Sequence, residues 1–105
     1  MDLLLRIKRL ALRGAVRFTE KARDEMEVDA LTPSDVIESL VNAQAVAKTI
    51  RSRSRARRYA GEKLYVIKSF NYEGTLIYTK GAVVKQAQEE VFYILVSSKL
   101  ATVGD

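Results

Sequence analysis

A run of arginines near the middle of the 105-residue chain is its densest group of side chains with an obvious chemistry. Arginine stays charged at any working pH and can donate two N–H groups to one phosphate. Ser52 and Ser54 lie within the run and add hydroxyl donors without bulk. The pattern favours contact with a nucleic-acid backbone, and the alternative is a solvated basic loop without a specific ligand. The predicted RNA-binding residues are Arg51, Arg53, Arg55, Arg57 and Arg58.

A second candidate is the lysine of the segment that precedes this run. From Ala45 onward the chain alternates as an extended strand does, and Lys48 shares one side with Val46 and Ile50. Placing an ammonium group among β-branched side chains is costly unless it is paired or stands at the rim of a cleft. Lys48 is therefore a candidate site residue, although its long stem could also carry the charge past its neighbours into water.

The composition limits the chemistry that such residues can perform. The formal net charge is +5, which favours encounter with polyanions, and the chain contains no cysteine and no histidine. Disulfides, thiolate catalysis, zinc–cysteine sites and serine or cysteine triads are thereby excluded. Any catalysis must use Lys, Arg, Tyr, Asp or Glu, and we expect no metal and no cofactor.

The elements that must position these residues form one domain over residues 1–105. An amphipathic pattern predicts a first helix that stops at Gly14, and Thr19 and Thr32-Pro33 mark the starts of two more. The acids near these starts suit helix N-termini and are interpreted as structural. Extended patterns follow over residues 45–51, 64–70, 75–84, with a bend at Gly81, and 91–99. The expected fold is α+β, with three N-terminal helices on one face of a four-stranded antiparallel sheet.

The first ten residues are apolar in patches, but charges interrupt them. No run is long enough for a signal peptide or a membrane span. We therefore expect a cytoplasmic protein with no membrane partner.

Four short stretches of the chain resemble the MqsR family of bacterial toxins, which are RelE-like ribonucleases of type II toxin–antitoxin systems. The resemblance covers nearly the whole chain in the order of its elements. It implies a RelE-like fold and metal-independent cleavage of mRNA, and it implies a cognate antitoxin, with a helix-turn-helix domain, as protein partner. The stretches are residues 7–10, 14–22, 46–50 and 95–99.

The resemblance also implies catalytic residues. The family's lysine on the first strand after the helices falls on Lys48, and its lysine near the chain end falls on Lys99. Its tyrosine falls on the strand of residues 75–80, where Tyr78 is the candidate. Since a register slip of one residue would turn Tyr78 to the other face, Tyr65 on the neighbouring strand is the alternative.

The implied reaction is attack of the RNA 2′-hydroxyl on its own phosphate. It needs a base for the 2′-proton, donors for the charge on the phosphoryl oxygens, and an acid at the 5′-oxygen. Like charges lower the pKa of clustered lysines, so Lys48 could act as the base, and Lys99 or a tyrosine as the acid. Two alternatives stay open: a non-catalytic RNA- or DNA-binding module, and a toxin that acts on a protein such as gyrase.

Overall fold

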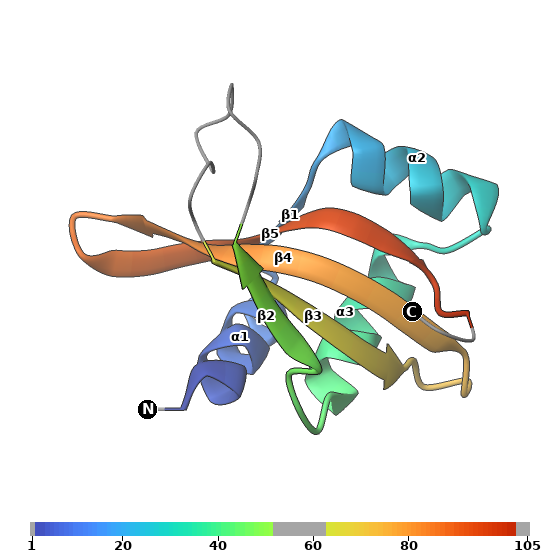
Figure 1. The fold of residues 1–105 in the computed structure, drawn as a ribbon, viewed down its shortest axis with the longest axis horizontal. Coiled ribbons are helices and arrows are strands. Elements are labelled where there is room, and N and C mark those ends of the chain that lie inside the picture. Colours follow the sequence, from blue (N-terminus) through green and yellow to red (C-terminus); the bar gives the residue numbers. More distant parts are fainter. Residues whose placement is uncertain (1, 52–62, 103–105) are drawn as a thin grey trace.

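The computed structural model describes residues 2–51 and 63–102. Three helices and five strands form an α+β domain, which confirms the expected class (Figure 1). The helices are α1 (Leu3–Leu12), α2 (Glu20–Val28) and α3 (Pro33–Asn42). The strands are β1 (Val16–Phe18), β2 (Lys48–Arg51), β3 (Lys63–Phe70), β4 (Leu76–Gln86) and β5 (Glu89–Leu100). The candidates Arg53, Arg55, Arg57 and Arg58 lie outside the described residues.

The sheet is mixed and five-stranded, so the expectation of a four-stranded antiparallel sheet was wrong in this detail. The strand order is β1-β5-β4-β3-β2, and β1 runs parallel to β5 while the other pairs are antiparallel. β1 is not among the strands predicted from the sequence. Three residues are too few for an alternation to show, and their pairing depends on β5, more than seventy positions away.

The helix boundaries follow local signals. Gly14 adopts φ +71°, and the N–H groups of Gly14 and Ala15 donate to the carbonyls of Ala11 and Leu10. This pair of hydrogen bonds is a Schellman motif, which ends α1 where the glycine predicted it. At the start of α3, Thr32 and Asp35 each accept a hydrogen bond from the other's backbone N–H, which forms a capping box.

The main core lies between the sheet and helices α1 and α3. Ile7 and Leu40 of the helices pack against Ile67, Tyr93 and Leu95 of the strands, and all five are fully buried. Because side chains alternate along a strand, the even-numbered residues of β3 point to the opposite face. A smaller apolar cluster of Leu64, Ala82 and Ile94 lies on that opposite face.

The second helix departs from the expected layer. Instead of lying beside α1 and α3, α2 runs along the outer edge of β5, beyond the end of β1 (Figure 1). Its Glu25 accepts hydrogen bonds from the Ser98 N–H at 3.0 Å and the Ser97 hydroxyl at 2.8 Å, and Asp29 accepts one from the Leu100 N–H at 2.8 Å. These carboxylates take the place of a neighbouring strand and protect the edge of β5.

Candidate nucleic-acid interface

The strand register brings two lysines to either side of Val66. Lys48 of β2 is the cross-strand partner of Val66, and so is Lys80 of β4. Directly opposite residues share a face, and Val66 is an even-numbered residue of β3, so both lysines lie on the face turned away from α1 and α3. Lys48, Val66 and Lys80 thus form a row across three strands, and the row ends at Ser97 of β5, which is opposite Lys80.

A second row runs next to the first on the same face. Lys68 of β3 lies opposite Tyr78 of β4, which lies opposite Lys99 of β5. The Nζ atom of Lys99 is 5.1 Å from the centre of the Tyr78 ring, within the range of a cation–π contact. We call the surface formed by both rows the lysine face: Lys48, Lys68, Lys80 and Lys99, with Tyr78.

Lys80 lies at the centre of the lysine face and is partly buried. Partial burial lowers the pKa of its ammonium below the usual 10.5. The nearby charge of Lys21 lowers this pKa further, while Glu25 raises it. Smaller effects of the same sign as Lys21 come from Lys99 and Lys48, so two other lysines of the face act on Lys80.

Glu25, the carboxylate that acts on Lys80, has a structural role. Burial raises the pKa of Glu25, but hydrogen bonds from Ser97 and Ser98 and the charge of Lys21 outweigh it, so the pKa lies below its usual value. Glu25 is therefore ionised at neutral pH, and its two oxygens are occupied by β5 and by Lys21, 3.4 Å away. The face consequently presents a surplus of positive charge.

The structure places three of the predicted catalytic residues, Lys48, Tyr78 and Lys99, on the lysine face. It does not bring Tyr65 to them. Tyr65 is opposite Thr49 and Gly81 and packs against the main core on the helix side. Of the two tyrosines that the sequence left open, only Tyr78 shares a surface with the lysines.

Of the five arginines predicted to bind RNA, Arg51 is the one that lies within residues 2–51 and 63–102. Arg51 is the last residue of β2 and lies opposite Lys63. Because it is three positions from Lys48, it points to the other side of the strand. Arg51 therefore does not extend the lysine face.

Lys68 and Lys80 were missed as site residues. Each reads in the sequence as an ordinary polar position of a strand. A signal was present, because Lys80 is two residues from Tyr78 and so shares its side of the strand. Lys68 could be added only once the register of β3 against β4 was known.

Residues 2–51 and 63–102 contain neither a metal-ligand cluster nor a membrane-spanning helix. No group of three or more His, Cys, Asp or Glu side chains within them could hold a metal ion. None of the helices in these ranges is long and apolar enough to cross a membrane.

Comparison with known proteins does not add to this geometry. No protein family, no curated protein and no solved structure matches the chain.

Proposed function

We propose that this protein is a metal-independent endoribonuclease that cleaves mRNA, and that it is the toxin component of a type II toxin–antitoxin system. The observation that carries the proposal is the grouping of four lysines and one tyrosine in two adjacent rows of a sheet face. A cationic surface of this kind attracts the phosphate backbone, and the exposed part of the Tyr78 ring can stack on a base.

The lysine face offers a group for each step of the reaction. A neutral amine removes the proton of the RNA 2′-hydroxyl, and we assign this role to Lys80 because its pKa is lowered. The 2′-oxygen then forms a bond to phosphorus as the bond from phosphorus to the 5′-oxygen breaks. Ammonium groups of Lys48 and Lys99 stabilise the charge on the phosphoryl oxygens.

The leaving 5′-oxygen must receive a proton, and we assign its donor as the hydroxyl of Tyr78. Tyr78 lies next to Lys99 in its row, and it is two residues from Lys80 on the same side of β4. The products would be one RNA end with a 2′,3′-cyclic phosphate and one with a free 5′-hydroxyl. In the sequence alone Lys48 was the candidate base, and the lowered pKa of Lys80 favours the new assignment.

The described carboxylates near the lysine face support a reaction without a metal. Glu25 and Asp29 hold the edge of β5 through hydrogen bonds. A carboxylate occupied in this way has less capacity to bind a cation. Metal independence is tested by cleavage in the presence of a chelator.

The chemical step is tested by an RNA that carries a single deoxynucleotide at the cleaved position. Since the 2′-hydroxyl is the nucleophile, this substitution should abolish cleavage at that position and leave binding intact. Continued cleavage there would refute 2′-hydroxyl attack.

The second candidate function is a non-catalytic RNA- or DNA-binding module. The charge of the lysine face favours it equally, because phosphate contact requires no proton transfer. An RNA that binds with a strong salt dependence but remains intact would establish this alternative.

The proposed partners are mRNA and a cognate antitoxin protein with a helix-turn-helix domain. Expression of the wild-type chain should arrest growth, and expression of the neighbouring open reading frame should relieve the arrest. Growth without arrest would contradict the toxin assignment. The nuclease assignment would still be decided by the cleavage assay.

A further inference from the structure

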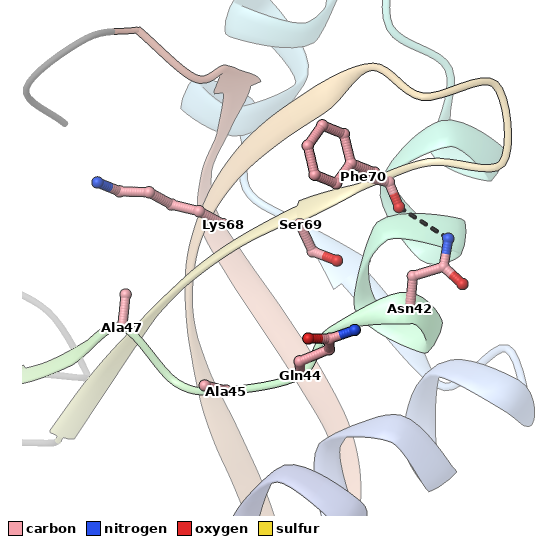
Figure 2. A pocket seen from close by; sticks show the side chains of 7 residues that line it. All are labelled: Asn42, Gln44, Ala45, Ala47, Lys68, Ser69 and Phe70. Carbon is pink, nitrogen blue, oxygen red and sulfur yellow. Dashed lines mark hydrogen bonds between the residues drawn. The ribbon is translucent and has the colours of Figure 1, made fainter.

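A cavity of about 470 Å³ lies at the edge of β3, next to the lysine face (Figure 2). Its volume falls in the range of about 300–1,000 Å³ that is typical of small-molecule sites. The polar groups around it come from the end of α3, from the connection to β2 and from β3. The residues used below are Asn42, Gln44, Lys68, Ser69 and Phe70.

The fold creates this cavity by leaving part of a strand edge unpaired. The pairing of β2 with β3 ends at Val66, whose carbonyl accepts a hydrogen bond from the Ala47 N–H at 2.7 Å. Four residues further on, the Phe70 carbonyl accepts one from the Asn42 side chain at 2.9 Å. Between these two contacts the backbone of Lys68 faces the cavity, because alternate residues of a strand direct their N–H and C=O groups to the same side.

Two polar side chains of the cavity have unused hydrogen-bonding capacity. Ser69 is only 7% exposed, but its hydroxyl is not among the fully buried side-chain atoms that lack a partner within residues 2–51 and 63–102, so water or a ligand in the cavity can reach it. Figure 2 shows this hydroxyl on the side of β3 that faces Asn42 and Gln44. Within the same ranges the Gln44 amide is also unpaired. A ligand with polar edges can take the place of water at these two groups.

The cavity is directly connected to the lysine face. Lys68 lines the cavity, and its side chain extends from β3 away from Ser69 (Figure 2) as a member of the lysine face. Phe70 follows two residues later on the same side of the strand and is 53% exposed. An exposed aromatic ring beside a lysine is a combination that stacks a base and holds its phosphate.

We propose that this cavity, which we call the β3-edge pocket, binds one nucleobase of the RNA and gives the nuclease its sequence preference. The inference rests on the proposed function and identifies the part of the substrate that the pocket reads. Lys68 holds the phosphate and Phe70 supports the base. The Gln44 amide, the Ser69 hydroxyl and the backbone of Lys68 then offer donors and acceptors to the edge of the base. Nucleobases differ in the donor and acceptor pattern of these edges, so such a pocket discriminates among them.

The test measures binding of four short 2′-O-methyl RNAs, each made of one base, by fluorescence anisotropy. Such RNAs cannot be cleaved by 2′-hydroxyl attack, so the readout is independent of catalysis. For the wild-type protein we expect affinities for the best and the weakest RNA to differ by about tenfold or more. In Gln44→Ala and Ser69→Ala this ratio should fall to about threefold or less, while the affinity for the weakest RNA stays the same.

Two variants serve as controls. Lys68→Met should lower the affinity for all four RNAs by a similar factor, because a phosphate contact does not distinguish one base from another. Gln86→Ala removes an exposed glutamine at the far end of β4 and should change neither ratio nor affinity.

The outcome separates this inference from the proposed function. A wild-type protein that binds all four RNAs equally, or folded variants that retain the wild-type ratio, would overturn the pocket assignment even if RNA is cut. A ratio that collapses in the variants, in a protein that leaves ordinary RNA intact, would retain the pocket and refute the nuclease.

Discussion

Lys99 and Tyr78 are direct cross-strand partners on β5 and β4, and the Lys99 Nζ atom lies 5.1 Å from the centre of the tyrosine ring. This contact uses the ring and not the hydroxyl, which is left for chemistry. The ring and the hydroxyl of Tyr78 can therefore be separated by mutation.

Tyr78→Phe should retain the cation–π contact and remove the proposed acid. We expect an unchanged melting temperature, RNA affinity within about twofold of wild type, and a cleavage rate reduced by about 10²-fold or more. Single-turnover cleavage and anisotropy on the same preparation measure both quantities. Wild-type cleavage by Tyr78→Phe would remove the tyrosine from the mechanism.

Lys80 is expected to control the pH dependence of cleavage. Only the neutral amine can accept a proton, so the rate should rise with pH and level off at the lowered pKa of Lys80, below 10.5. Lys80→Arg keeps the positive charge but cannot supply a neutral base, so it should cut at least about 10²-fold more slowly and lose this rise. A pH–rate profile identical to wild type would assign the base elsewhere.

The same residue should reduce the stability of the native protein. The folded pKa of Lys80 lies below its unfolded value, so burial of the charge costs stability in full at pH values below the folded pKa. Stability rises as pH increases from the folded pKa toward 10.5, where the unfolded state binds more protons. Lys80→Met removes this penalty. Its melting temperature at pH 7 should equal or exceed that of wild type, and a clear decrease would indicate a structural role instead.

Much of the scaffold around these residues could be predicted from local patterns. The stop of α1 at Gly14 and the capping box of α3 are encoded within a few residues. The turn between β3 and β4 is equally local, because Asn71 accepts hydrogen bonds from the N–H groups of Glu73 and Thr75. Signals of this kind need no knowledge of distant partners.

The remaining features depend on pairing between distant segments. β1 becomes a strand only through β5, and α2 lies where its carboxylates find the free N–H groups of that strand. The grouping of Lys68 and Lys80 with Tyr78 follows from the strand register, which no single strand specifies. The choice of Tyr78 over Tyr65 likewise required the register, since the two residues point to opposite faces.

Glu25 provides a test of the edge that α2 protects. Its pKa is lower in the folded protein than in the unfolded chain. The ionised carboxylate therefore stabilises the fold at pH values above the unfolded pKa near 4.5, and this contribution is lost as pH falls through the folded pKa. Glu25→Gln should cost about 1–3 kcal/mol of unfolding free energy at pH 7. The difference from wild type should disappear in acid below the folded pKa, as followed by urea titrations at several pH values. A difference that is constant with pH would rule out the charge as its cause.

Gly81 tests the packing beneath the lysine face. The register of β4 against β5 shifts between Lys80 and Gly81. A Cβ atom at position 81 would lie 2.7 Å from Tyr93 Cζ and 2.8 Å from the Ile94 carbonyl oxygen. Gly81→Ala should therefore destabilise the protein by about 1–3 kcal/mol. In a Tyr93→Leu background the cost should be smaller because the ring is absent, and equal costs in both backgrounds would disprove this explanation.

The most direct test of the lysine face is cleavage of a single-stranded RNA in excess EDTA by wild type, Lys48→Met, Lys99→Met and Lys63→Met. Lys63 is an exposed lysine on the other side of β3 and serves as the matched control. We predict 2′,3′-cyclic phosphate ends from wild type and Lys63→Met, and at least about 10²-fold slower cleavage by Lys48→Met and Lys99→Met, with melting temperatures close to that of wild type. Full cleavage by the folded Lys48→Met and Lys99→Met proteins, or wild-type cleavage that requires added magnesium, would contradict the account.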